Sequence, residues 1–380
     1  MKSAGRVVVL VVAVTLAGCS SSGAKKVAGS TTTTSKAPTT TGATTSTVPA
    51  TTVPLSPALP APATSGALHL AATIALPLTT GPVFAAEAPD GAVFVAQSTS
   101  PVYVIDGDQA PAVAEHVAGG VAALAADANL LYAASYTAAS TTVFAYDRTS
   151  GTETGHWSLP GINAANASDA QLIFLTASGG GVWVLITAGN NVDAYLIEPS
   201  TAAAPVLIAT SLGATVGPDG SLYYERTDGH LVRRDVNGVV TVGPVLANAP
   251  NGEGGGVQYV DTVAGGLLWV DEPAGQGLDA TYNTFNATTL VPAGGPFPGN
   301  TNESGITDTL AGTLDVTDGN ATVSCPMQGT LSVECLFRIS STAALSDPTS
   351  VGSGFALLGP YPAVVAANAA NTMLQLDRFS

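Results

Sequence analysis

The strongest constraint on the fold is a pattern that returns about every 45 residues from Phe94 to the end of the chain. One series consists of short strand-like runs that mostly end near an acidic or amide residue: Val102–Asp106, Val143–Asp147, Ala194–Glu198, Leu231–Asp235, Tyr282–Asn286, Leu336–Ser340 and Leu374–Asp377. A second, often aromatic series lies upstream of each run: Phe94, Tyr132, Trp183, Tyr223, Trp269, Asp315 and Val365. Four short strands and their turns need about 45 residues. The chain therefore repeats a four-stranded unit.

Seven members in each series predict an all-β protein, a seven-bladed β-propeller. Six or eight blades remain alternatives, because the spacing between Asn286 and Ser340 is irregular. A stacked β-solenoid would show a shorter repeat. The last run reaches the C-terminus, so the final blade lacks an outer strand. An unassigned apolar segment, Leu68–Pro77, would complete that blade, close the ring and leave no open sheet edge.

The N-terminus indicates export. Lys2 and Arg6 precede a short apolar run that leads into Leu16-Ala17-Gly18-Cys19. Basic, apolar and then small residues are the layout of a secretory signal peptide. The last four residues resemble the lipobox of bacterial lipoproteins, which implies cleavage before Cys19 and acylation of its side chain. A transmembrane anchor is the weaker interpretation, because the run has about 11 residues and a spanning helix needs about 20. A cleaved signal without lipid is a further alternative.

The chain then divides into residues 1–18 as a signal peptide, 19–66 as the lipidated cysteine with a disordered tether, and 67–380 as one propeller domain. Thr, Ser, Pro and Ala dominate the tether, and such a segment cannot bury enough apolar surface to order itself. An unmodified spacer and an O-glycosylated stalk both fit this composition. We expect the domain on the extracytoplasmic face of the cell membrane, as a monomer held through lipid at Cys19.

The net charge of the body limits the classes of partner that we expect. All 27 acidic residues lie at or after Glu87, where six arginines are the only basic residues apart from histidine, so the body carries a formal −21. Such a surface repels phosphate backbones and anionic headgroups. Nucleic acid is therefore not an expected partner. The acidity serves solubility or attracts cations and cationic ligands.

Cysteines offer one further constraint. With Cys19 lipidated, Cys325 and Cys335 remain as an even pair on either side of a turn-like Pro-Met-Gln-Gly stretch. In an oxidising compartment they predict a disulfide that staples a hairpin. Three cysteines and four scattered histidines do not predict a zinc site.

Two repeats resemble known propeller families. Val216–Tyr224, continuing through Gly229 to Asp235 and Gly238, looks like an NHL-type repeat, and Pro89-Asp90-Gly91 repeats its opening turn. Asp-Gly suits a hairpin turn, because glycine supplies the positive φ. Ala145–Gly151 with Trp157 is similar to the repeat of pyrroloquinoline-quinone-type propellers. These resemblances imply a propeller fold and do not imply a particular function.

Candidate ligand residues lie in loops that propellers gather at one end of their channel. The expected loops join second to third strands and one blade to the next. Asn251, Glu253, Asp271 and Glu272 are the most compact set, because they flank one blade's entrance strand. Carboxylates and amides suit a hard cation such as Ca²⁺, or sugar hydroxyls. Asn and Asp also dominate ordinary turns for backbone reasons, so each residue has a structural interpretation as well.

The function that these observations favour is a binding or interaction module of the cell envelope. Its ligand would be an envelope protein, a small molecule or a glycan. The alternative is a metal-dependent hydrolase or lactonase with its site at the channel mouth, near His116 or His230. No Gly-x-Ser-x-Gly or His-Glu-x-x-His motif is present. Trp157, Trp183 and Trp269 do not share a repeat position, which argues against a quinone pocket and favours core packing for the aromatic series.

Overall fold

A computed structural model gives the architecture of the chain. It describes residues 66–136, 141–159, 173–178, 180–188, 191–201, 203–211, 213–217, 219–246, 259–264, 266–272, 281–298, 315–317, 320–326, 332–338, 349–351, 354–357 and 361–380. Within these ranges the regular elements are all β-strands, and they form seven antiparallel sheets of four strands each. The predicted all-β class is therefore confirmed.

The first three sheets in chain order use consecutive strands joined by short turns. One sheet contains β2 (Phe84–Glu87), β3 (Val93–Ala96), β4 (Val102–Ile105) and β5 (Ala112–Glu115). The next contains β6 (Ala123–Ala126), β7 (Leu130–Tyr136), β8 (Thr141–Asp147) and β9 (Glu153–Leu159). The third contains β10 (Ile173–Ser178), β11 (Gly181–Ala188), β12 (Asn191–Ile197) and β13 (Val206–Ser211).

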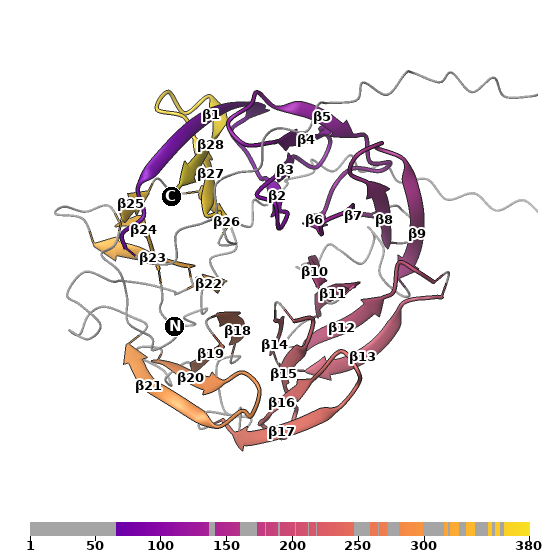
Figure 1. Ribbon diagram of the computed structural model, residues 1–380, viewed down its shortest axis with the longest axis vertical. Helices are drawn as coiled ribbons and strands as arrows, with labels where there is room; N and C mark the ends of the chain where they lie inside the picture. The colour runs from indigo at the N-terminus through magenta and orange to yellow at the C-terminus, as the bar shows by residue number, and fades with distance from the viewer. Residues whose placement is uncertain are drawn as a thin grey trace, which may run out of the picture.

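Three further sheets continue this order. They are β14 (Gly213–Val216), β15 (Leu222–Glu225), β16 (His230–Arg234) and β17 (Val240–Val245); β18 (Tyr259–Ala264), β19 (Leu267–Glu272), β20 (Thr281–Asn286) and β21 (Pro292–Pro298); and β22 (Asp315–Thr317), β23 (Asn320–Pro326), β24 (Ser332–Arg338) and β25 (Thr349–Val351). Figure 1 shows the sheets following one another around a common centre, with the first strand of each sheet inside and the fourth outside.

The last sheet joins the two ends of the described body. It has the order β1-β28-β27-β26, with β26 (Gly354–Leu357), β27 (Ala363–Ala367), β28 (Met373–Phe379) and, from the start of the chain, β1 (Leu70–Thr79). β1 runs antiparallel to β28, and Thr73 Oγ1 donates to Asp377 Oδ1 over 2.6 Å. The strand expected at Leu68–Pro77 therefore forms and takes the outer position of this sheet.

The two marker series fall on defined strands. The runs of the first series all lie on third strands: β4, β8, β12, β16, β20, β24 and β28. The second series lies on second strands with one exception: Asp315 begins β22, a first strand, and β23 is the second strand of that sheet. Spacing alone had assigned Asp315, because that repeat carries no aromatic marker. This position in the series is corrected.

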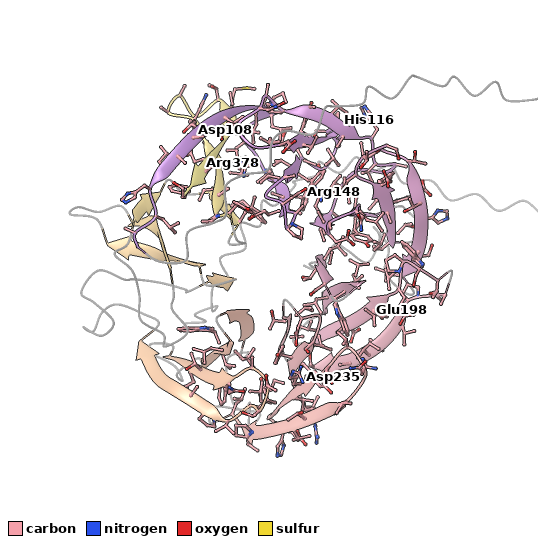
Figure 2. The ribbon with its side chains drawn as sticks, viewed as in Figure 1. Asp108, His116, Arg148, Glu198, Asp235 and Arg378 are labelled. Atoms are coloured by element: carbon pink, nitrogen blue, oxygen red, sulfur yellow. The ribbon has the colours of Figure 1, made fainter. Side chains whose placement is uncertain are left out.

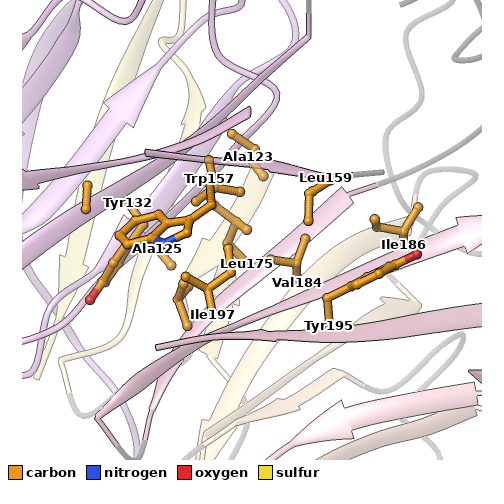
Figure 3. Close-up of a cluster of buried hydrophobic side chains, with 14 residues drawn as sticks. Ala123, Ala125, Tyr132, Trp157, Leu159, Leu175, Val184, Ile186, Tyr195 and Ile197 are labelled. Atoms are coloured by element: carbon orange, nitrogen blue, oxygen red, sulfur yellow. The ribbon is translucent and has the colours of Figure 1, made fainter. Parts of the chain in front are cut away.

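The aromatic members of the second series lie in the core. Phe94, Tyr132, Trp183, Tyr223 and Trp269 have between 1 and 2 % of their surface exposed. One cluster joins the sheets β6–β9 and β10–β13 through Trp157, Tyr195 and their aliphatic neighbours (Figure 3). Burying such rings is the main favourable contribution to folding, so the expectation of core packing holds for this series.

Cys325 and Cys335 lie on the paired strands β23 and β24, which confirms the hairpin. The register places Cys325 opposite Val333 and Cys335 opposite Val323, so the two cysteines are offset by two positions. Diagonal neighbours of this kind are about 7–8 Å apart, whereas disulfides prefer Cα atoms closer than about 6.8 Å. The described part of the chain contains no disulfide, and this register disfavours one.

Candidate functional site

The predicted ligand set falls partly within the described chain. Asn251 and Glu253 lie outside the described residues, as does Cys19. Asp271 and Glu272 are the last two residues of β19, where Asp271 is opposite Tyr259 and Tyr282. The Leu246 N–H donates to Gly229 O over 2.9 Å, so the segment that leads to Asn251 leaves β17 beside the turn between β15 and β16. Of the predicted set, the structure thus describes only the backbone of Asp271 and Glu272, and the turn between β15 and β16 lies beside Leu246, just after β17.

The turn from Arg226 to His230 carries two ionisable side chains, Arg226 and His230, beside Asp228. Arg226 donates to the Asp228 carboxylate, the His230 N–H donates to Asp228 Oδ1 over 3.2 Å, and His230 Nδ1 lies 3.2 Å from the same oxygen. Desolvation acts to raise the pKa of Asp228, but these hydrogen bonds and the Arg226 charge together lower it. Asp228 is thus ionised at neutral pH and already serves to hold its own turn.

Glu225 precedes this turn and was not predicted. Its side chain is fully buried at the end of β15, where the residue pairs with Gly213 and Leu231. Glu225 lies two residues after Tyr223, as Asp271 lies two residues after Trp269 in the next sheet. The repeat therefore sets two carboxylates at matching positions of neighbouring second strands. Burying a carboxylate is costly unless it is paired or protonated.

Other Asp and Asn residues on the predicted loops act as turn formers. Asn368 Oδ1 accepts from the N–H groups of Thr372 and Met373 over 3.0 and 3.4 Å. Asn371 has a φ of 52°, a left-handed conformation that asparagine tolerates. These two residues from the predicted loops thus have the structural role that turn chemistry gives them.

The two histidines considered for a metal site lie in different sheets. His116 is exposed just after β5 (Figure 2), whereas His230 begins β16 beside Asp228. Among the residues that the structure describes, no three His, Cys, Asp or Glu side chains group as metal ligands would. The Ca²⁺ prediction concerns residues whose side chains lie outside that description and stays a prediction.

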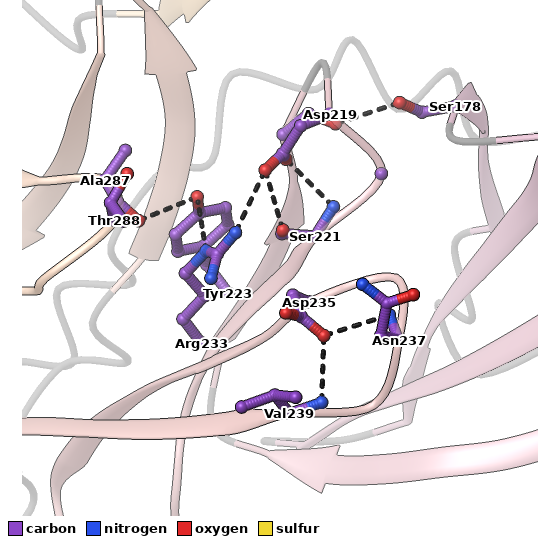
Figure 4. Close-up of polar contacts among 12 residues, drawn as sticks. Ser178, Asp219, Ser221, Tyr223, Arg233, Asp235, Asn237, Val239, Ala287 and Thr288 are labelled. Atoms are coloured by element: carbon purple, nitrogen blue, oxygen red, sulfur yellow. Dashed lines mark hydrogen bonds and ion pairs between the residues drawn. The ribbon is translucent and has the colours of Figure 1, made fainter.

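The opposite ends of the strands carry the best-defined polar network. Asp219 accepts from Ser221 N, Ser221 Oγ and Arg233 Nη2, and Arg233 Nε donates to the Tyr223 hydroxyl over 3.3 Å (Figure 4). Tyr223 then donates to Ala287 O of the next sheet over 2.9 Å. Burial raises the pKa of Tyr223, so it remains a neutral donor. This network joins two sheets.

A second network at these ends is centred on Arg148. Its Nη2 contacts both oxygens of Asp90 in the preceding sheet, at 2.9 and 2.8 Å, and its Nη1 donates to Asp127 O and Ala128 O. The guanidinium also lies over the Phe94 ring, 5.3 Å from its centroid. Arg148 is 11 % exposed, and it works as a connector between sheets.

A third arginine connects the last sheet to the first. Arg378 of β28 is 5 % exposed, and its Nη2 donates to Ile105 O over 3.2 Å. Burial lowers its pKa, and the carboxylates of Glu87, Asp108 and Asp106 oppose that effect. Figure 2 shows Arg378 and Asp108 in the region where the two sheets meet. Arg148 and Arg378 thus each connect two neighbouring sheets.

No helix in the described ranges has the length and apolar character needed to cross a bilayer.

Comparison with known proteins gives similarity at the level of structure only. No family model matches the sequence, and no curated protein matches it. Among solved structures, the chain is similar to BamB from Moraxella catarrhalis, with 12% identity, a TM-score of 0.44, and coverage of 82% of this chain and 100% of that one. It is also similar to the WD40 β-propeller domain of Doa1, with 13% identity, a TM-score of 0.47, and coverage of 82% and 97%. The WD40 domain of Toxoplasma gondii coronin matches with 11% identity, a TM-score of 0.46, and coverage of 82% and 86%.

Proposed function

We propose that this chain is a lipid-anchored, extracytoplasmic β-propeller of seven blades that acts as a ligand-binding or protein-interaction module of the cell envelope. The repeat spacing and the four-stranded sheets around a common centre support the propeller. The pairing of β1 with β28 supports closure of the ring, because the outer strand of the last sheet comes from the start of the domain.

The observation that carries the functional proposal is the position of β1. It begins at Leu70 as the outermost strand of its sheet, so the proposed tether enters at the outer rim (Figure 1). An anchor attached at the rim of one sheet does not cover the described turns of the other sheets, such as the turn with the half-exposed Arg226 and Asp228 side chains. A domain joined to its anchor in this way presents its loops and outer strands to partners, as an interaction module requires.

Acylation of Cys19 is tested by comparing the full chain with its Cys19→Ser variant. We expect the unaltered chain in the membrane fraction, labelled by radioactive fatty acid, and the variant without label and released from membranes. Equal fractionation and the absence of label from both chains would overturn the anchoring proposal.

For the ligand site, we propose that Asn251, Glu253, Asp271 and Glu272 bind Ca²⁺ or a hydroxyl-rich ligand beside the Arg226–His230 turn. The hydrogen bond from Leu246 to Gly229, and the position of Asp271 and Glu272 at the end of β19, support this location. Calorimetric titration of the full chain with CaCl₂ tests it, with MgCl₂ as the matched ion. We expect heat with Ca²⁺ that Glu272→Gln weakens and Asp235→Asn leaves unchanged. Absence of heat would overturn the metal site.

A further inference from the structure

Lysine is confined to the N-terminal part of this chain. All four lysines, Lys2, Lys25, Lys26 and Lys36, come before the first residue that the structure describes, Gly66. The body from residue 67 onwards contains no lysine and only six arginines. A protease that cleaves after Lys or Arg therefore has few bonds to cut in the body, whatever the conformation of the loops.

The long connections between the described strands contain none of these arginines. The longest of them are residues 160–172, 247–258, 273–280, 299–314 and 339–348, and the sequence has no Lys or Arg in any of the five. Long surface connections are the places where proteases ordinarily cut a folded domain. A protease specific for basic residues is therefore excluded from them by sequence alone.

Three of the body arginines are held by buried side chains. Arg148, Arg233 and Arg378 are at most 14 % exposed, and each donates a hydrogen bond to an acceptor on its own or a neighbouring sheet. A protease of trypsin-like specificity takes the whole side chain before the cut bond into a pocket. Each of these arginines would have to leave its sheet before it could enter such a pocket.

Two further arginines end strands that lie inside their sheets. Arg234 is the last residue of β16, which pairs with β15 and β17, and Arg338 is the last residue of β24, which pairs with β23 and β25. Proteases bind their substrates as extended chains through free backbone N–H and C=O groups. The strands before Arg234 and Arg338 already use these groups in the ladders on both of their sides.

Arg226 is the one body arginine that is exposed among those the structure describes. It lies in a turn that its own backbone closes: the Arg226 N–H donates to His230 O over 2.9 Å, and the Gly229 N–H donates to Arg226 O over 2.8 Å. Cleavage of the Arg226–Thr227 bond would require this turn to open into an extended segment. We therefore expect it to be a slow site of cleavage.

We propose that the segment between Cys19 and the body is a processing site, at which a serine protease of trypsin-like specificity cuts after Lys36 and releases the body intact. Water hydrolyses the Lys36–Ala37 bond and leaves a carboxylate on Lys36 and an amino group on Ala37. The Thr-, Ser- and Pro-rich composition of the segment predicts a chain that a protease binds without first unfolding a domain. This inference rests on the proposed lipid anchor, because release has a consequence only for an anchored chain.

Trypsin treatment of membranes from the producing cells tests whether the chain is cut in this way, with intact mass and N-terminal sequencing of the products. We expect one soluble fragment that begins at Ala37. Cuts within the body should be at least about a thousandfold slower, because they require the rare unfolded molecules. A variant that combines Lys25→Gln, Lys26→Gln and Lys36→Gln should stay in the membrane fraction. Arg226→Gln is the matched control and should be released like the original chain.

The medium of untreated cells shows whether the producing cells make the same cut. We expect the fragment that begins at Ala37, and we expect benzamidine, an inhibitor of trypsin-like proteases, to prevent its release. Three results would overturn the proposal: no such fragment in the medium, release of the triple variant at the original rate, or trypsin cuts in the body that precede the cut at Lys36. A chain that is soluble before it is cut at Lys36 rejects the anchor alone, whereas a chain that stays uncut in the membrane rejects the processing site alone.

Discussion

Two interfaces between neighbouring sheets meet the same structural need with different residues. In the first, the sheet β2–β5 contacts β6–β9; in the second, β14–β17 contacts β18–β21. Each begins with an Asp-Gly turn, at Asp90 and Asp219, and an aromatic ring follows four residues later, Phe94 or Tyr223. In the first interface Arg148 of the next sheet reaches back to Asp90 and covers the Phe94 ring.

In the second interface the arginine that pairs with the Asp-Gly turn comes from the same sheet as that turn. Asp147 accepts a hydrogen bond from Ser150 N, and Asn286 accepts the equivalent bond from Thr289 N. Ala287, directly after Asn286, therefore occupies the position that Arg148 has directly after Asp147. Asp219 is instead paired with Arg233 of its own sheet, and the Tyr223 hydroxyl makes the contact to Ala287 O. The repeat thus determines where the sheets are joined, and either sheet can supply the group that joins them.

The two interfaces also place their small and large side chains on opposite sides. In the first interface Gly151 accommodates Glu115, because a Cβ added at Gly151 would be 2.5 Å from Glu115 Oε1. In the second, Leu290 takes the position of Gly151 with a φ of 56°, and the facing strand has Gly243. In each interface a glycine on one side is thus matched with a larger side chain on the other.

The largest effect is expected for Leu290→Ala. This side chain is 1 % exposed and packs in the second interface, so its truncation should lower the free energy of unfolding by about 2–4 kcal/mol. The neighbouring Val291→Ala removes an exposed side chain and should change stability by less than about 0.5 kcal/mol. Urea unfolding followed by circular dichroism measures both. Equal effects at the two positions would break the comparison of sizes.

Arg148→Ala should come next, with a loss of about 2 kcal/mol, because the change removes charge-assisted bonds to Asp90 and leaves two carbonyls without their donor. Arg226→Ala is the matched control, since its pair with Asp228 is exposed and worth less than about 0.5 kcal/mol. Urea midpoints compare the two variants. A loss no greater than that of the control would mean that Arg148 does not join the sheets.

Tyr223→Phe converts the second interface towards the first and removes one buried hydrogen bond. The expected loss is about 1 kcal/mol, because the Ala287 carbonyl loses its donor and Arg233 Nε loses its acceptor, whereas Arg233 Nη2 keeps Asp219. Tyr224→Phe, on the opposite face of the same strand, serves as control and should be close to neutral. The melting temperature checks the difference. Equal melting temperatures of the two variants would mean that the Tyr223 hydroxyl does not join the sheets in the way that Arg148 does in the first interface.

The smallest effect depends on pH. Burial raises the pKa of Glu115 from 4.5 to about 7, so the folded state favours the neutral carboxyl. The stability that this preference contributes is fully present below about pH 4.5 and is lost as the pH rises through about 7. Glu115→Gln keeps the size and removes the titration. The variant should therefore match the original at pH 4.5 and exceed it at pH 8, by at most about 1 kcal/mol because solvent screens a partly exposed carboxylate. A difference independent of pH would contradict the packing of Glu115 against Gly151.

Much of the fold was predictable, because each repeat of about 45 residues in the sequence corresponds to one four-stranded sheet in the structure. The third strands and the buried aromatic series were located correctly from Phe94, Tyr223 and their equivalents. Asp315 was misplaced because its repeat lacks an aromatic residue. The offset of Cys325 and Cys335 was not predictable either, since it depends on the register of a hairpin whose turn length the sequence does not state.

The site was less predictable for a physical reason. Turn-forming and ligand-binding carboxylates have the same local sequence, and only hydrogen bonds such as those of Asp228 and Asn368 separate the two roles. Glu225 was hidden within a series attributed to the core. The contact between Arg148 and Asp90 joins residues of different repeats, so no local pattern contains it. The exposure of the β17 valines likewise depends on which strand lies outermost in the sheet.

Ring closure is tested most directly by a cysteine pair at the junction of β1 with β28. Thr73→Cys and Asp377→Cys occupy facing positions and are introduced into a full chain whose native cysteines are replaced by serine. We expect an intramolecular disulfide to form on mild oxidation and to raise the melting temperature, because it cross-links residues far apart in the unfolded chain. Thiols that remain free, or that link separate chains, would contradict the closed ring.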